Sequence, residues 1–162
     1  MAISRTCYAN VFDIKDCIPL TEARRTIFHK FVAKLLYLSK RVRPDISVAA
    51  SFLCTRVTKA TAEDECKLDR VMKYLNGTKT TGMCLGGSEP LQVTAYIDAS
   101  YGVHADGKSH SGLVITLGHG PVLCRSTKQK IVTKSSTESE LIAVSDEINM
   151  AFFTTKGTRR AQ

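Results

Sequence analysis

The sequence lacks the features that would place it among membrane or secreted proteins. No hydrophobic run approaches the roughly 18 residues that a membrane-spanning helix needs. Residues 1–20 contain no long apolar segment behind a basic start, which a secretory signal peptide would show. Internal repeats and low-complexity linkers are absent as well. We therefore expect an intracellular protein with no membrane partner.

The cysteines give no sign of a metal or disulfide framework. Six cysteines lie at positions 7, 17, 54, 66, 84 and 124, and none forms a Cys-x-x-Cys pair. No histidine stands at zinc-ligand spacing from any of them. Reduced thiols are the simplest interpretation in an intracellular chain, and a zinc site is not expected.

The charge of the chain is strongly positive, at +8 over 162 residues. No acidic residue lies between Asp106 and Glu138, where five basic residues are found: Lys108, Arg125, Lys128, Lys130 and Lys134. Two interpretations stay open for this segment. It suits a polyanion such as nucleic acid, and it equally suits an ordinary solvated face.

The first half of the chain has the pattern of helices. Residues 23–42 place Ile27, Phe31, Leu35 and Leu38 at helical spacing, and other apolar residues widen this stripe.

Local signals divide this half into three helices. Pro44 disfavours helix at the residue before it and can open the next helix. Thr61 is a predicted N-cap because three acidic residues follow it in the first turn. Asn76 and Gly77 are expected to end this third helix.

The second half has the pattern of strands followed by one helix. Segments 91–102, 111–121 and 122–134 are rich in strand formers and are separated by turn residues, which predicts a three-stranded antiparallel meander. In segment 135–153, apolar residues recur at helical spacing: Leu141, Val144, Ile148 and Phe152. The predicted fold class is α+β (α/β), with a helical segment followed by a β-β-β-α unit.

Two carboxylates in this unit are candidates for chemistry. Asp98 interrupts an apolar strand, where a carboxylate is costly unless it is exposed, paired or bound to a cation. Glu140 opens the last helix and could face Asp98, so that a divalent cation such as magnesium could lie between them. The structural alternatives are a strand-end position for Asp98 and a capping box of Thr137 with Glu140.

These residues also carry a resemblance to a known family. Asp98-Ala99, Ser109 to Gly112, Ser126 to Gln129 and Ser135 to Glu140 resemble, in this order, the motifs of the ribonuclease H domain in copia-type retrotransposon Pol polyproteins. Upstream, segments 35–57 and 68–82 resemble the connection between polymerase and ribonuclease H in the same polyproteins. The resemblance covers about residues 10–150.

The resemblance implies an organisation and an activity. We expect a tail from a polymerase region at 1–22, a helical connection segment at 23–80, a partial ribonuclease H-like domain at 90–153 and a basic tail at 154–162. The family hydrolyses the RNA strand of RNA–DNA hybrids with two Mg²⁺ (or Mn²⁺) ions.

The resemblance also assigns roles to individual residues. Asp98 would bridge both metals, and Glu140 would support the metal at the leaving group, whereas Glu138 would be a capping or surface residue. Nucleic-acid contacts are expected from several polar residues: Ser109, Ser111, Lys128, Lys130 and Lys134. The expected partners are the hybrid and the remainder of the Pol polyprotein, in a cytoplasmic virus-like particle or in the nucleus.

The chain departs from the family pattern in two respects. It shows no match to the two later acidic positions of the ribonuclease H domain, nor to the polymerase Tyr-x-Asp-Asp turn. Weak or no hydrolysis is therefore expected from this truncated pattern. A nucleic-acid-binding or polymerase-associating module without catalysis, or a degenerate element remnant with no selected role, remain as alternatives.

Overall fold

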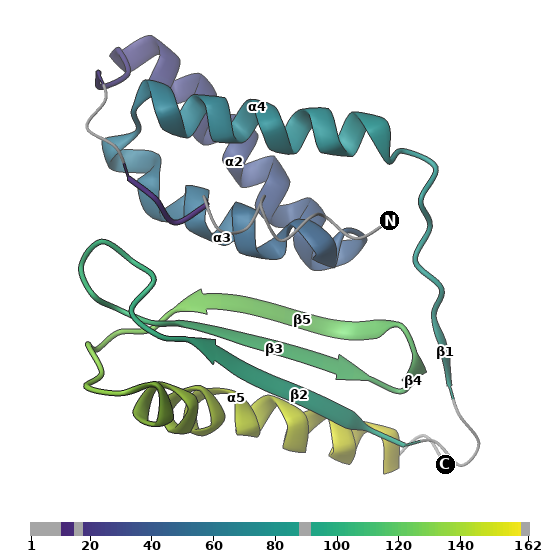
Figure 1. The fold of residues 1–162 in the computed structure, drawn as a ribbon. Coiled ribbons are helices and arrows are strands. Elements are labelled where there is room, and N and C mark those ends of the chain that lie inside the picture. Colours follow the sequence, from purple (N-terminus) through teal and green to yellow (C-terminus); the bar gives the residue numbers. More distant parts are fainter. Residues whose placement is uncertain (1–10, 15–17, 88–91, 160–162) are drawn as a thin grey trace. The chain divides into compact units, whose positions relative to one another are not determined.

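The computed structural model describes residues 11–14, 18–87 and 92–159, so parts of the expected N-terminal tail lie outside the described residues. The chain divides after Gly82 into two compact units, called unit 1 and unit 2 below. Unit 1 is helical, and unit 2 contains a sheet and one long helix (Figure 1). The predicted mixture of helices and strands is confirmed. No helix among the described residues is long and apolar enough to cross a membrane.

Unit 1 is a helical bundle with an apolar core. Its elements are α2 (Glu22–Arg41), the short 3-10 helix η1 (Pro44–Ile46), α3 (Ser47–Arg56), the 3-10 helix η2 (Val57–Lys59) and α4 (Ala62–Gly77). The helices pack around one cluster of buried side chains, among them Phe28, Val32, Leu35, Ala50, Phe52, Leu53 and Leu68. α4 ends at Gly77, as predicted.

The buried face of α2 covers only part of the predicted apolar stripe. The buried residues are Phe28, Val32, Leu35 and Ser39, whereas Ile27 is 54% exposed and Phe31 is 40% exposed. α2 carries apolar residues on two adjoining stripes, and helical spacing fits both of them. The contacts with α3 and α4 select the stripe that begins at Phe28, which leaves Ile27 and Phe31 on the outside.

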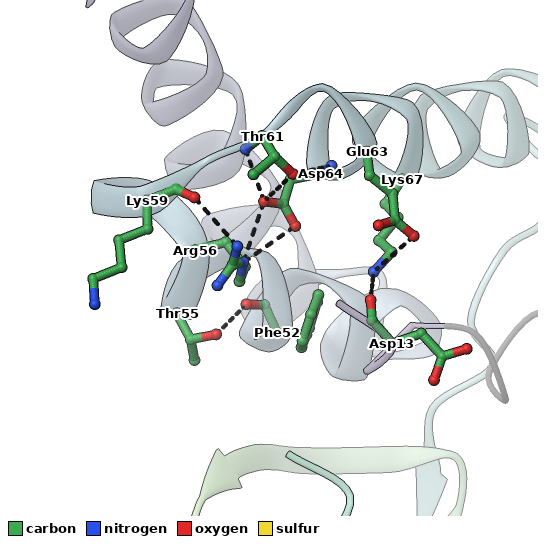
Figure 2. Close-up of polar contacts among 9 residues, drawn as sticks. All are labelled: Asp13, Phe52, Thr55, Arg56, Lys59, Thr61, Glu63, Asp64 and Lys67. Carbon is green, nitrogen blue, oxygen red and sulfur yellow. Dashed lines mark hydrogen bonds and ion pairs between the residues drawn. The ribbon is translucent and has the colours of Figure 1, made fainter. Parts of the chain in front are cut away.

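The start of α4 confirms Thr61 as its N-cap. Thr61 Oγ1 accepts a hydrogen bond from the backbone N–H of Asp64, and the Asp64 carboxylate accepts one from the backbone N–H of Thr61 at 2.9 Å. Figure 2 shows that the same carboxylate also meets Arg56, whose Nε lies 3.2 Å from Asp64 Oδ2. Asp64 is buried, and its charge is compensated by one guanidinium and by the backbone N–H and hydroxyl of Thr61.

Unit 2 contains the predicted antiparallel meander. Its strands are β1 (Gly86–Gly87), β2 (Thr94–Ser100), β3 (His110–Thr116), β4 (Gly118–His119) and β5 (Pro121–Lys128), and they precede α5 (Ser136–Arg159). β2, β3 and β5 form one sheet in the order β2-β3-β5, and β1 pairs with β4. α5 therefore extends through most of the segment that was expected to be a basic tail.

α5 lies along β2 and contacts β3 less (Figure 1). Its buried residues are Ser139, Ala143 and Glu147, at four-residue spacing, while the apolar stripe that indicated the helix is exposed at Leu141, Val144, Ile148 and Phe152. Small residues let the helix approach the sheet closely. Glu147, 1% exposed, forms an ion pair with Arg125 of β5 at 2.9 Å. Much of the interior of unit 2 is thus polar and depends on specific hydrogen bonds.

Candidate active site

The first turn of α5 is capped by Ser135 and Glu138. Ser135 Oγ accepts a hydrogen bond from the backbone N–H of Glu138 at 3.2 Å, and Glu138 Oε2 accepts one from the backbone N–H of Lys134 at 2.7 Å. The alternative capping box of Thr137 with Glu140 is therefore wrong. The helix begins at Ser136, which places Thr137 inside it, and Glu138 has the capping role expected for it. Glu140 takes no part in the cap.

Gln129, immediately after β5, ties the sheet to the start of α5. Its Nε2 donates to Ser111 Oγ at 2.9 Å and to the backbone carbonyl of Ser139 at 2.8 Å. Its backbone N–H donates to the carbonyl of Ser109, which extends the pairing of β3 with β5. The amide is buried, and its Oε1 has no hydrogen-bond partner among the described residues. We refer to the contacts of Gln129 with Ser111 and Ser139 as the Gln129 clasp.

The clasp identifies the face of the sheet on which Asp98 lies. Ser111 faces α5 because Gln129 joins it to Ser139, and Ala99 of β2 lies opposite Ser111. Cross-strand partners share a face, and neighbours along a strand alternate. Asp98 lies opposite Gly112, so its side chain leaves the strand on the face turned away from α5. β2 is an edge strand of the described sheet, so the Asp98 side chain is exposed beside an open edge.

Glu140 lies close along the chain to the same clasp. It follows Ser139 and is exposed, and Asp98 precedes Ala99, the residue opposite Ser111. Asp98 lies near the C-terminal end of β2 and Glu140 near the start of α5, and Figure 1 shows these two element ends at the same end of unit 2. Among the described residues, none forms a hydrogen bond or ion pair with either carboxylate, and no group of three or more His, Cys, Asp or Glu side chains could hold a metal. The candidate site therefore offers a metal ion two carboxylates, those of Asp98 and Glu140.

The expected nucleic-acid contacts separate into two groups. Ser109 and Ser111 are buried, and their hydroxyls are engaged within unit 2: Ser109 Oγ bonds Thr133 Oγ1 at 3.1 Å, and Ser111 Oγ accepts from Gln129. The prediction that these two serines contact nucleic acid does not fit this burial.

Unlike the two serines, the three lysines are at least partly exposed. Lys128 forms an ion pair with Asp106 at 2.6 Å, and this hydrogen bond lowers the pKa of the Asp106 carboxyl. Lys130 and Lys134 are exposed, and neither has an acidic partner among the described residues. Both lysines precede α5, the helix that carries Glu140.

A buried histidine pair beside the site was missed by the sequence analysis. His104 Nε2 lies 3.0 Å from His110 Nδ1, and His110 Nε2 lies 2.7 Å from Ser126 Oγ. Burial lowers the pKa of both imidazoles to about 4, with Lys128 adding to the effect on His104. The signal available in the sequence was two histidines flanking a short glycine-containing loop between strands.

Several known proteins similar to this chain are Pol polyproteins from transposons. The retrovirus-related Pol polyprotein from transposon RE1 of Arabidopsis thaliana is 38% identical over 122 residues, which is 75% of this chain. That from transposon TNT 1-94 of Nicotiana tabacum is 32% identical over 116 residues, or 71% of this chain. The chain belongs to the copia-type retrotransposon Pol family.

This copia-type chain spans only 8% of the RE1 polyprotein and 9% of the TNT 1-94 polyprotein. A further relative is named secreted RxLR effector protein 161, from Plasmopara viticola. It is 32% identical over 132 residues, covering 81% of this chain and 93% of that protein. No family model matches the chain, and no solved structure matches it.

Proposed function

We propose that unit 2 of this copia-type chain is part of a ribonuclease H domain that acts on the RNA strand of RNA–DNA hybrids. Asp98 and Glu140 are its first two acidic ligands. The observation that supports this most directly is the Gln129 clasp, since it ties β3, the strand paired with β2 that carries Asp98, to the helix turn that carries Glu140. Because Ser135 and Glu138 satisfy the helix cap, Glu140 is available for another role.

The donor chemistry of the two carboxylates suits a hard divalent cation. Mg²⁺ takes oxygen ligands and is commonly bound through one or two carboxylates together with substrate phosphates, and Mn²⁺ accepts the same donors. When bound, such an ion activates water and stabilises the charge that develops at the phosphate. The chain's own residues would contribute ligand oxygens from Asp98 and Glu140, and phosphate contacts from Lys130 and Lys134.

Two carboxylate ligands are few for metal-dependent hydrolysis of RNA. We propose that the chain binds the hybrid and hydrolyses it weakly unless the remainder of a Pol polyprotein supplies further carboxylates. Hybrid binding then depends mainly on the lysines, and hydrolysis depends on the carboxylates.

A cleavage assay tests this assignment. The purified chain is incubated with a hybrid labelled on its RNA strand, in Mg²⁺ or Mn²⁺, beside the variants Asp98→Asn and Glu140→Gln. Glu138→Gln is the matched control because glutamine still offers an oxygen to the backbone N–H of Lys134. Slow cleavage that both site variants lose and the control retains is the expected result. Cleavage that survives in the site variants would assign the activity elsewhere.

A binding module without catalysis is the second candidate. The exposed and unpaired Lys130 and Lys134 favour it, because they can neutralise phosphates without any metal. Hybrid binding that weakens steeply with salt, is indifferent to Mg²⁺ and comes with no cleavage would support this candidate over hydrolysis. A folded chain that neither binds nor cleaves the hybrid would contradict both proposals and favour a remnant without a selected role.

A further inference from the structure

One exposed face of α2 in unit 1 combines cations with aromatic and apolar side chains. Residues three or four positions apart share a helix face. On this face all the side chains are exposed: Arg24, Ile27, Lys30, Phe31, Lys34, Tyr37 and Arg41. We call these seven residues the α2 basic–aromatic face. It includes Ile27 and Phe31, which belong to the apolar stripe that indicated this helix.

The charge of this face is largely uncompensated. Arg24 forms an ion pair with Glu65, whereas Lys30, Lys34 and Arg41 have no acidic partner among the described residues. The single acidic residue of α2 is Glu22, at the helix start, and it pairs with Arg25 outside this face. Three cations therefore lie along about 16 Å of helix, at about 1.5 Å of rise per residue.

The aromatic rings on this face lie beside the cations. Lys34 Nζ is 5.7 Å from the centre of the Phe31 ring, and the Arg41 guanidinium is 5.7 Å from the centre of the Tyr37 ring. Tyr37 is 67% exposed. Exposed rings interleaved with cations are the surface on which unpaired bases stack while the phosphates are neutralised.

Two other anionic partners, a membrane surface and an acidic protein, fit this face less well. A helix that lies in a membrane surface gathers its apolar residues on one side and its cations on the other. In α2 the large apolar side chains Phe28, Val32 and Leu35 are already buried in the core of unit 1, and the exposed face mixes both kinds of residue. An acidic protein surface would match the cations but gives the exposed rings no bases to stack on.

We propose that the α2 basic–aromatic face binds a single-stranded nucleic acid, with Lys30, Lys34 and Arg41 at the phosphates and with Tyr37 and Phe31 stacked on bases. This site lies outside unit 2 and does not depend on the proposed hydrolysis. It gives the chain a contact for a strand that is not paired in a hybrid.

Binding of a labelled single-stranded oligouridine to the full chain, measured by fluorescence anisotropy without divalent metal, tests the proposal. The variant Lys30→Ala/Lys34→Ala/Arg41→Ala is expected to bind with a weaker salt dependence. The negative slope of log affinity against log salt should decrease in magnitude by about 2, since each phosphate contact contributes about 0.7. The matched control is the variant Arg70→Ala/Lys73→Ala/Lys79→Ala, in α4 and the turn after it, which removes the same charge and should keep the slope. An equal change of the slope in both variants would overturn the proposal.

A second pair of variants tests stacking in case the triple variant does not fold. Tyr37→Ala should weaken binding at least fivefold, and Tyr37→Phe should retain it, because a stacked base is worth about 1–3 kcal/mol. Equal affinity of the two variants would contradict stacking.

Two further measurements separate other sources of binding. If Lys130→Ala/Lys134→Ala abolishes oligouridine binding, the surface belongs to unit 2 and the α2 proposal fails, whatever the hybrid assay shows. Phosphatidylserine vesicles that bind with the same dependence on Tyr37 would overturn it in favour of a membrane surface.

Discussion

The side chain of Gln129 donates a 2.8 Å hydrogen bond to the backbone carbonyl of Ser139, which joins the residue after β5 to the first turn of α5. The same nitrogen donates to Ser111 Oγ, so one buried amide connects two strands and the helix. Glu140 follows Ser139 of the clasp, and Asp98 precedes Ala99, the partner of Ser111 on β2. The proposed site therefore depends on a side chain that needs no contact with substrate.

Substitution of Gln129 by glutamate is expected to loosen the start of α5. Glutamate keeps the shape of the side chain but has no N–H, so it leaves the buried Ser139 carbonyl without its donor and turns an oxygen towards it. The expected cost is about 1–3 kcal/mol of unfolding free energy. Hydrogen exchange should accelerate at the amides of the first turn of α5. The exposed neighbour Lys130→Gln is the control, and equal exchange in both variants would contradict the role of the clasp.

The elements of unit 2 could be predicted because local signals define them, but the clasp could not. Strand formers alternate along β2 and β3, and hydroxyl residues precede α5. Nothing in a sequence indicates that Ser111 and Gln129, 18 positions apart, meet in the interior. Ser109 and Ser111 were expected to contact nucleic acid because of the family resemblance, and here both are buried and hydrogen-bonded to Thr133 and Gln129.

Replacement by alanine should change the stability of the fold differently at Glu138 and at Glu140. Glu138→Ala removes the acceptor of the Lys134 N–H and is expected to cost about 1 kcal/mol, the usual effect of losing a helix cap. Glu140→Ala removes no described hydrogen bond and should leave stability almost unchanged. Chemical unfolding followed by circular dichroism compares the two variants. An equal loss in both would mean that Glu140 has a structural role.

The His104–His110 pair predicts acid sensitivity. Burial lowers the pKa of both imidazoles from 6.5 to about 4; Lys128 adds to this for His104, Asp106 opposes it, and His104 adds to it for His110. Unfolded histidines bind protons below pH 6.5, whereas these two stay neutral in the fold until about pH 4. The stability that they contribute is therefore lost as the pH falls from 6.5 to 4.

Denaturant midpoints measured across this pH range test the histidine prediction. The variant His104→Gln/His110→Gln should show a shallower loss of stability between pH 6.5 and pH 4 than the unsubstituted chain. His29→Gln, an exposed position on α2, is the control and should follow the unsubstituted chain. The same pH dependence in the double variant would assign the acid sensitivity to other groups.

Asp64 is expected to be the most sensitive acidic residue of unit 1. Asp64→Ala removes the reciprocal cap at Thr61 and leaves the Arg56 guanidinium without its buried partner (Figure 2). Loss of one member of a buried pair costs about 3 kcal/mol. Asp64→Asn should cost less because its side-chain oxygen can still accept from the Thr61 N–H. Asp69→Ala, which removes an exposed pair with Lys73, should change the unfolding midpoint little.

The faces of the helices were harder to predict than their bounds. α2 and α5 each carry more apolar residues than their contacts bury, so periodicity located the helices without selecting the packed side. In α5 the buried side chains are Ser139, Ala143 and Glu147, and the buried glutamate is tolerated because Arg125 and Thr127 of β5 bond its carboxylate. Such a pairing is a property of the assembled unit.

Two glycines with positive φ should differ sharply in their tolerance of alanine. Gly102 has a φ of +59° and open space around it, so Gly102→Ala carries only the backbone cost, about 1 kcal/mol. Gly120 has a φ of +73°, and a Cβ there would lie 2.0 Å from the carbonyl oxygen of Cys84. Gly120→Ala must therefore displace the chain before β1 and disturb its pairing with β4. Unfolding midpoints and hydrogen exchange at β1 and β4 compare the variants, and a Gly120→Ala variant no less stable than Gly102→Ala would contradict this close approach.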